Sequence, residues 1–168
     1  TVGVPYAPSM ETGLLFPVEA RSMSERLDAR RDTVAERVAE AASVTPADRQ
    51  FVWWCNLNAE SAALTKAIPG AVETLGSDSD ETKERKLVDF SEGRIRVLVT
   101  KPSVAGFGMN WQHCRNDLYV GLNHSFETFY QCGKRIHRFG QKRQVRRWII
   151  QTDTENGVMK SILRKQGQ

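Results

Sequence analysis

The chain has 168 residues, of which 40% are hydrophobic and 26% are charged, so it is long enough to bury the core of one domain. Its net charge is +4 and its pI about 9.1, a modest basic balance that is compatible with nucleic acid. The longest apolar runs have the length of strands and no signal peptide is visible, which argues against a membrane protein.

The N-terminal region is expected to hold a connection and a long helix. Residues 1–20 contain three prolines and predict an extended connection. An S-x-x-E capping box that starts at Ser22 opens a helix, which we expect to run to about residue 42. The arginines of this helix alternate with Asp and Glu, a pattern typical of a solvent-exposed face and not of a DNA patch; they are Arg26, Arg30, Arg31 and Arg37.

From residue 50 onward, short apolar runs alternate with segments that have helical periodicity. The predicted strands cover residues 50–56, 71–75, 95–100, 117–122 and 145–151. The predicted helices cover residues 58–67, 80–91, 126–134 and 154–165. This alternation favours a single α/β domain over residues 21–168, with a parallel sheet and helices on both of its faces.

The tryptophans are expected to pack in the core. Trp53, Trp54 and Trp148 fall within predicted strands, where large aromatic side chains serve the core or a sheet face. Trp111 falls in a loop, and for it core packing is favoured over a contact with DNA or with a second lobe.

The three cysteines, Cys55, Cys114 and Cys132, are scattered along the chain. No C-x-x-C pair occurs, and no set of four ligands has a recognised metal-binding spacing. We therefore predict neither a metal site nor a disulfide framework. Free thiols fit a reducing, cytoplasmic setting.

Residues 131–147 carry seven Lys and Arg and no Asp or Glu. Within them, Gln131, Arg135 and Arg138 have a Q-x-x-x-R-x-x-R spacing, which places them on one face if the helix continues. Two guanidiniums held side by side repel each other, so the spacing indicates a polyanion between them, such as a nucleoside triphosphate that is losing its γ-phosphate. The alternative is a solvated basic helix end that binds nucleic acid or nothing.

Two further stretches follow predicted strands. The run before Thr100 is rich in β-branched residues, and a G-x-G-x-N sequence follows at Gly106, Gly108 and Asn110. Gly76 and Ser77 follow the predicted strand 71–75. Ligands bind at the carboxyl ends of parallel strands, and glycines let a backbone approach a phosphate. A G-x-G alone is better explained by a tight turn, but this one lies 25 residues before Gln131 with a predicted strand between them, and that position makes it specific.

Together with the apolar strand at residues 51–56, and taken in chain order, these stretches resemble the signature motifs of the second lobe of superfamily 2 helicases and DNA translocases, over roughly residues 48–150. The R-I-H-R-F-G-Q sequence at residues 135–141 is most similar to the motif of the Swi/Snf-type branch. The resemblance implies a RecA-like lobe that works with ATP and Mg²⁺. It also implies that Arg135 and Arg138 are arginine fingers on the γ-phosphate and that Gln131 faces the same nucleotide.

The resemblance extends to the other two stretches. It implies a nucleotide contact from Gly106, Gly108 and Asn110. It implies a grip on the DNA backbone from Gly76, Ser77, Thr100 and Lys101. The sequence departs from the Swi/Snf pattern at residues 123–127, which replace a Trp-Asn-Pro, and this fits a phage or bacterial relative better than a chromatin remodeller.

Two expected motifs are missing. The chain has no G-x-x-x-x-G-K-[ST] phosphate loop and no apolar run that ends in Asp-Glu, and it begins at Thr1. We interpret it as the second lobe of a two-lobe motor, whose first lobe would bind most of the ATP and Mg²⁺ and whose other partner is DNA. Two alternatives remain: a nucleic-acid-binding α/β module without an ATPase role, and a catalytically dead scaffold lobe, which the intact arginines disfavour.

The basic segment has one more candidate role. Arg143, Arg146 and Arg147 are expected either to form a second, purely electrostatic patch for DNA or to be ordinary charges that flank a strand.

Overall fold

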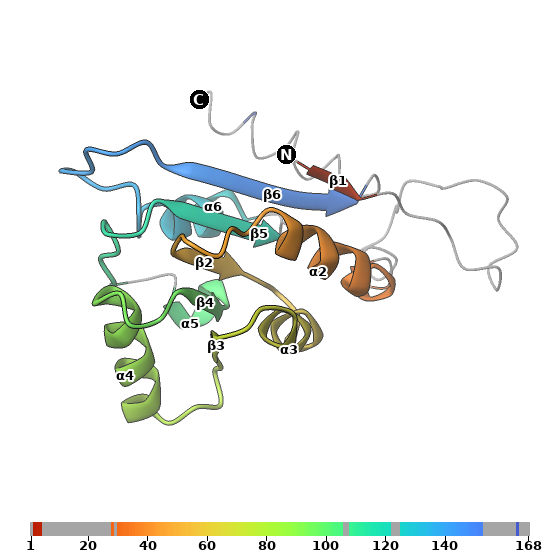
Figure 1. Cartoon of the computed structure of the whole chain (residues 1–168), viewed down its shortest axis with the longest axis horizontal. Coiled ribbons are helices and arrows are strands. Elements are labelled where there is room, and N and C mark those ends of the chain that lie inside the picture. The colour runs from red at the N-terminus through yellow and green to blue at the C-terminus, as the bar shows by residue number, and fades with distance from the viewer. Residues whose placement is uncertain are drawn as a thin grey trace, which may run out of the picture.

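A computed structural model of the chain describes residues 2–4, 28, 30–105, 108–121, 125–152 and 164. The described residues form a six-stranded sheet in the order β1-β6-β5-β2-β4-β3, in which every pairing is parallel (Figure 1). The strands are β1 Val2–Val4, β2 Phe51–Trp54, β3 Ala71–Thr74, β4 Val97–Thr100, β5 Asn116–Val120 and β6 Arg146–Thr152. The parallel sheet that the sequence predicts is confirmed.

Helices cover both faces of this sheet. They are α2 Val34–Ser43, α3 Asn58–Ala67, α4 Asp80–Ser91, α5 Pro102–Ala105 and α6 Phe126–Gly133. Side chains of α2 and α3 share one buried cluster with one face of the sheet, and side chains of α4, α5 and α6 share another with the opposite face. Among the described residues, no helix is both long enough and apolar enough to cross a membrane.

The two central strands are buried on both faces. In β2, Phe51 and Trp53 point into the cluster shared with α2 and α3, which we call the α2–α3 cluster. Val52 and Trp54 point into the cluster shared with α4, α5 and α6, which we call the α4–α6 cluster. All four residues of β2 are buried, and so are all four of β4. This explains why both strands appear in the sequence as continuous apolar runs without a polar alternation.

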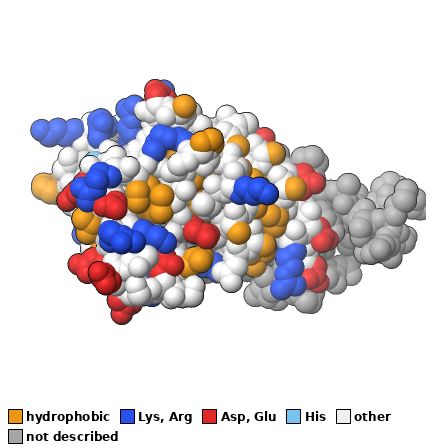
Figure 2. Space-filling view, turned by 60° about the horizontal axis from the view of Figure 1, so that its bottom comes forward, with side chains coloured by type: hydrophobic (Ala, Val, Ile, Leu, Met, Phe, Trp, Pro, Cys, Tyr) orange, Lys and Arg blue, Asp and Glu red, His pale blue; other side chains and the backbone are white. Residues whose placement is uncertain are grey.

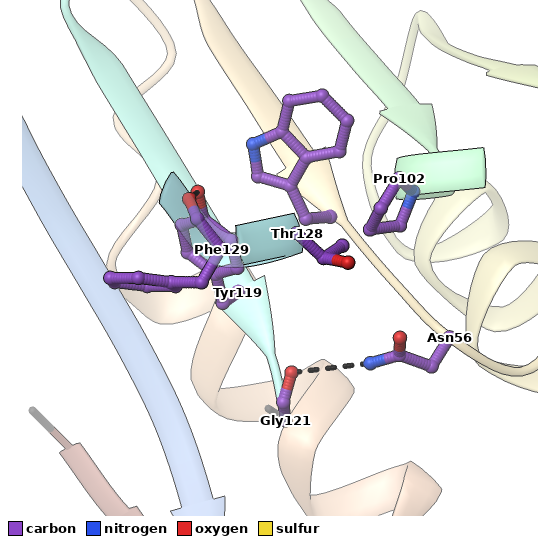
Figure 3. Close-up of a pocket in the computed structure, with 7 residues that line it drawn as sticks. Asn56, Pro102, Tyr119, Gly121, Thr128 and Phe129 are labelled. Atoms are coloured by element: carbon purple, nitrogen blue, oxygen red, sulfur yellow. Dashed lines mark hydrogen bonds between the residues drawn. The ribbon is translucent and has the colours of Figure 1, made fainter. Parts of the chain in front are cut away.

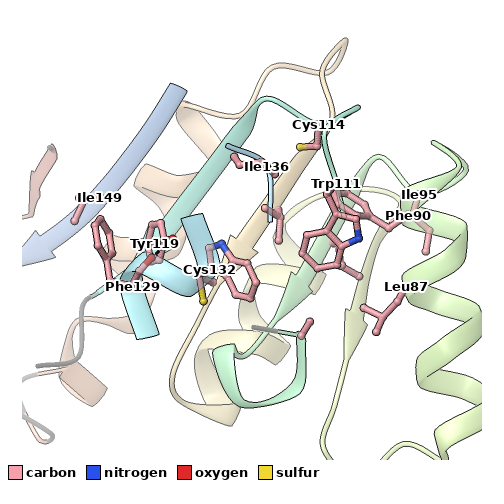
Figure 4. Close-up of a cluster of buried hydrophobic side chains, with 14 residues drawn as sticks. Leu87, Phe90, Ile95, Trp111, Cys114, Tyr119, Phe129, Cys132, Ile136 and Ile149 are labelled. Atoms are coloured by element: carbon pink, nitrogen blue, oxygen red, sulfur yellow. Dashed lines mark hydrogen bonds between the residues drawn. The ribbon is translucent and has the colours of Figure 1, made fainter. Parts of the chain in front are cut away.

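The tryptophans pack as predicted. Trp53 and Trp54 are buried, and Trp148 is half-buried with its ring 5.2 Å from that of Phe51. Trp111 is fully buried in the α4–α6 cluster, where its ring lies edge-on to Phe90 at 5.1 Å (Figure 4). Its indole N–H donates to Ser91 Oγ at 3.1 Å, so core packing is its role.

Some predicted boundaries differ from the structure. Val2–Val4, within the predicted extended connection, form strand β1, in which Val2 pairs with Ile150. The four-residue helix α5 was not predicted, because a single helical turn has no periodicity to detect. The capping box at Ser22 lies outside the described residues, and of the predicted helix 154–165 only the helical Arg164 is described.

The prediction of a solvent-exposed arginine face is wrong for Arg30 and Arg37. Only 7% of Arg30 and none of Arg37 is exposed. Arg37 Nε donates to Thr33 Oγ1 at 2.9 Å, and Arg30 Nε lies 4.0 Å from the buried Glu60 carboxylate. A β-carbon added at Gly121 would lie 2.4 Å from Arg37 Nη1, so glycine leaves room for these guanidiniums beyond the end of β5.

A buried ion pair joins β5 and β6. Arg147 donates to both carboxylate oxygens of Asp117, at 3.0 and 2.9 Å from Nε and 2.7 Å from Nη2. Burial raises the pKa of the fully buried Asp117 carboxyl, and the Arg147 guanidinium opposes that rise. Arg147 is therefore not part of a surface patch for DNA, which was one of the two roles that the sequence left open for it.

The same guanidinium also holds α6 against the sheet. It lies 5.4 Å from the centroid of the Tyr119 ring and 4.9 Å from that of Phe129, which belongs to α6. Gly133, the last residue of α6, packs so closely that an added β-carbon would lie 2.3 Å from Arg147 Nη2. Because Asp117 fixes Arg147, the C-terminal end of α6 has a defined position.

We expect Gly133→Ala to destabilise the domain by about 1–3 kcal/mol, the usual cost of overpacking. In an unconstrained helix the same change would stabilise by up to about 1 kcal/mol, so the sign of the effect is diagnostic. The measurement is urea unfolding followed by circular dichroism. Gly76→Ala is the control, because its nearest contact would be Val104 at 4.0 Å. A Gly133→Ala protein as stable as the parent would mean that Arg147 does not set the position of α6.

Candidate functional site

The predicted arginine pair lies at the amino end of the sheet. Helix α6 starts beyond the carboxyl end of β5 and runs back antiparallel to it. Its last turn, which contains Gln131, therefore lies toward the amino end of the sheet. The helix ends at Gly133, and Arg135 and Arg138 follow it in a turn and a loop. Helical spacing therefore does not by itself bring the two arginines together.

A backbone carbonyl brings them together instead. Arg135 Nη1 and Arg138 Nη1 both donate to the carbonyl oxygen of Met109, at 3.0 and 3.4 Å. Arg135 Nε also donates to the Gln131 carbonyl at 3.2 Å, and the Arg135 carbonyl accepts the Trp111 N–H at 2.8 Å. The end of α6 and the loop before Trp111 thus form one hydrogen-bonded unit.

The electrostatics of this unit are unbalanced. Arg135 is 7% exposed, whereas Arg138 is exposed. Burial lowers the pKa of the Arg135 guanidinium, and the charge of Arg138 lowers it further. Two cations share one neutral acceptor, so an anion with several oxygens would bind here more strongly than the carbonyl does.

Two of the three predicted G-x-G-x-N residues lie beside the arginines. Gly108 has φ of +84°, a conformation that favours glycine, and Asn110 is exposed. They flank Met109, the residue whose carbonyl receives both guanidiniums. Gly106 lies outside the described residues. The structure therefore brings Gly108 and Asn110 together with Arg135 and Arg138.

A second candidate site lies at the carboxyl ends of β2, β3 and β4. A surface depression of about 450 Å³, which we call the strand-tip pocket, is open there. Its lining includes Asn58, Glu73, Gly76, Ser77, Lys101 and Ser103. Three of the four residues predicted to grip the DNA backbone are thus neighbours, and Gly76 and Ser77 are exposed.

Local contacts shape this pocket. Lys101 Nζ donates to Asn58 Oδ1 at 2.6 Å. The turn that presents Gly76 and Ser77 is held by Asp78, whose carboxylate accepts the Leu75 N–H at 3.0 Å and pairs with Lys86 at 2.7 Å. These bonds from Lys86 and from the backbone lower the pKa of the Asp78 carboxyl. The turn is therefore held in place without any ligand.

The structure does not bring the Thr100 side chain to the pocket surface. Thr100 is fully buried, and its Oγ1 lies 3.5 Å from the Thr74 carbonyl of the neighbouring strand. Sequence reasoning missed Asn58 and Ser103, which do line the pocket. Asn58 begins α3 shortly after β2 ends, so the strand-end rule applied to β2 would have found it.

A third hollow is too small for a ligand. It lies beyond β2 and β5, where Asn56 Nδ2 donates to the Gly121 carbonyl at 3.4 Å, and it is also lined by Tyr119 and Thr128 (Figure 3). Its volume of about 10 Å³ is close to the space that one water molecule requires. We therefore exclude it as a binding site for a nucleotide.

The chemistry of the described residues includes no metal centre and no reactive thiol. No group of three His, Cys, Asp or Glu side chains in the described part could hold a metal ion. Burial raises the pKa of Cys55, Cys114 and Cys132 to about 12, so these cysteines remain protonated thiols at neutral pH.

Comparisons with known proteins identify the fold. No family model and no curated protein matches the sequence. The chain is similar to the crystal structure of the C-terminal part of the Fun30 ATPase domain, with a TM-score of 0.61 and 16% identity. That match covers 83% of this chain but 45% of the other, so this chain spans less than half of its relative.

A second similar structure is the E. coli DEAD-box protein SrmB, solved in complex with RraA, the regulator of ribonuclease activity A. The TM-score is 0.65 and the identity 16%, over 79% of each chain. At this identity the likeness concerns the fold and not the chemistry. With the parallel sheet and its two helical layers, it establishes the predicted fold class: an α/β, RecA-like single lobe.

Proposed function

We propose that this chain is the second motor lobe of a superfamily 2, Swi/Snf-like DNA helicase or translocase. The observation that carries the proposal is the convergence of Arg135 and Arg138 on the Met109 carbonyl, beside Gly108 and Asn110. The likeness to part of the Fun30 ATPase domain and to a DEAD-box protein supports it. ATP and Mg²⁺ would be bound mainly by a first lobe, because this chain has no phosphate loop.

In this proposal Arg135 and Arg138, with the Met109 carbonyl that joins them, stabilise charge during phosphoryl transfer; we call this group the arginine unit. When phosphate oxygens replace the Met109 carbonyl, Arg135 keeps its bond to the Gln131 carbonyl, so the orientation of its guanidinium is set in advance. Arg138 is exposed and makes a longer bond, so it is the guanidinium that reaches across the cleft to the γ-phosphate. Gln131 lies on the same segment and helps to place the phosphate.

The strand-tip pocket holds the nucleic acid backbone in this proposal. Lys101 supplies a positive charge and Ser77 a hydroxyl, and Gly76 lets a phosphate approach the chain closely. Thr100 contributes by fixing the end of β4, from which Lys101 extends, because its own hydroxyl is buried. None of these groups reads a base, so binding is independent of sequence.

A nucleic-acid-binding module without an ATPase role is the second candidate. The exposed Lys142, Arg143 and Arg146 favour it, since none of them lies in the arginine unit or in the strand-tip pocket. The two candidates differ in what the arginine pair does, and an ATPase measurement separates them.

In a protein that joins this lobe to its nucleotide-binding lobe, we expect Arg135→Ala or Arg138→Ala to reduce DNA-stimulated ATPase roughly 10³-fold, the scale of arginine fingers. Lysine should not restore activity, because it lacks the planar fork of the guanidinium. ATP and DNA affinities should change much less. Arg94→Ala, which removes an exposed arginine at the end of α4, is the control. Near-normal turnover in both alanine variants would exclude the finger role.

The chain by itself should release no phosphate from ATP above background, with or without DNA, because its sequence contains no phosphate loop to bind the triphosphate. The measurement is phosphate release by the purified chain. ATPase that persists through stringent repurification, and that disappears in an Arg138→Ala sample prepared in parallel, would contradict the assignment as one lobe of two.

We expect the chain to bind DNA weakly, with Kd about 10⁻⁴–10⁻⁶ M at physiological salt, and almost independently of sequence. Ser77→Ala combined with Lys101→Ala should weaken binding and reduce the slope of log K against log[salt] by about 0.9 for duplex DNA, the effect of one lost phosphate contact. Lys66→Ala, which changes an exposed lysine at the far end of α3, is the matched control. An unchanged affinity in the double variant would place the DNA elsewhere.

A further inference from the structure

A tight turn presents Phe139 to solvent. The Gln141 N–H donates to the Arg138 carbonyl at 3.0 Å and closes the turn, and Gly140 has φ of +92°, which favours glycine there. The Phe139 side chain at the tip is fully exposed, more so than any other large hydrophobic side chain among the described residues.

The exposure of Phe139 is built into the loop. The Gln141 side-chain amide donates to the Gln112 carbonyl at 2.8 Å and to the Ile136 carbonyl at 3.2 Å. The Gln112 amide in turn donates to the Phe139 carbonyl. The backbone of the turn is therefore tied to the segment before β5 and cannot move onto the core without breaking these bonds.

A single exposed apolar side chain is common on protein surfaces, and the charges around this one set it apart. Exposed cations lie on both sides of it in the chain, at Arg138, Lys142, Arg143 and Arg146. None of the four forms a salt bridge with a described residue, and residues 131–147 contain no Asp or Glu. Figure 2 shows Lys and Arg side chains gathered at the end of the molecule where β6 begins.

We propose that the Phe139 turn binds single-stranded nucleic acid, with the ring stacked on an unpaired base and with Lys142, Arg143 and Arg146 on the adjacent phosphates. An aromatic ring set among cations is the usual platform for single strands, because every base has a π-face. Arg143 is held for this role by its bond to the His113 carbonyl at 2.8 Å. A duplex hides its base faces, so it would use the cations and not the ring.

The inference deepens the proposed function and rests on it for the kind of polymer. The turn precedes β6 and so lies at the amino end of the sheet, whereas the strand-tip pocket lies at the carboxyl ends. The two surfaces are therefore separate contacts, and the Phe139 turn is suited to an unpaired strand that has left the duplex held by the pocket.

The experiment uses the whole chain and a Phe139→Trp variant. Trp53, Trp54 and Trp111 are buried and Trp148 is half-buried, so the added indole is the fully exposed one, and the parent protein titrated in parallel gives the signal of the other four. Titration with single-stranded DNA should quench this emission while affinity is kept. Phe139→Ala and Phe139→Leu should each weaken single-strand binding about tenfold, as loss of one base stack does. Binding of a blunt duplex should be unaffected. Val88→Ala, another exposed apolar side chain, is the control.

The outcomes separate this inference from the proposed function. Unquenched Phe139→Trp emission at saturating oligonucleotide, or full affinity in Phe139→Leu, overturns the stacking site, since an apolar protein contact would accept leucine. If the Ser77 and Lys101 variants still weaken duplex binding, the proposed function survives that result. Conversely, if the Phe139 variants weaken single-strand binding while the Ser77 and Lys101 variants leave duplex binding unchanged, the stacking site stands and the strand-tip pocket is excluded as the duplex site. Parallel titrations with RNA identify which nucleic acid is preferred.

Discussion

The buried pair of Asp117 and Arg147 is the interaction on which the arrangement of this lobe depends. It ties β5 to β6 in the sheet, and through Phe129 and Gly133 it also sets where α6 ends. The position of Arg135 follows from that end. Removing Arg147 would leave the fully buried Asp117 carboxylate without its partner, which destabilises the fold. The same contact that stabilises the sheet therefore also aligns the candidate chemistry.

The candidate sites lie at opposite ends of the sheet, and one segment joins them. It leaves β4 at Thr100, contributes Lys101 to the strand-tip pocket, forms α5, and reaches Met109 between the two arginines. Residues 106 and 107 of this segment are not among those described. If the proposed function holds, a displacement at either end of this short connection has a direct covalent route to the other.

Much of the fold could be predicted, because strands that are buried on both faces leave continuous apolar runs in the sequence. The Gln131–Arg138 spacing marked out a candidate site, but the helix ends at Gly133 and the two arginines meet through the Met109 carbonyl, which the spacing could not predict. Which residues of neighbouring strands lie side by side could not be predicted. Asp117 and Arg147 become partners only once β5 and β6 are paired, so the sequence offered Arg147 only as part of a DNA patch or as a charge that flanks a strand. Thr74 and Thr100 end β3 and β4 side by side and cover each other, which buried a side chain expected at an exposed tip. The burial of Arg30 and Arg37 likewise depends on distant Glu60 and Gly121.

The pairing of β1 with β6 has a consequence for solubility. β1 covers β6 only from Ile150 to Thr152, and among the described residues nothing pairs with the outer side of the strand before that point. An open, apolar strand edge is a template for aggregation, and proteins commonly protect such edges with charge. Here the uncovered stretch begins with Arg146, which is exposed, while the apolar Ile149 and Ile150 lie toward the covered end. The exposed charge of Arg146 at the start of the uncovered stretch therefore disfavours edge-to-edge pairing of two copies along this part of β6.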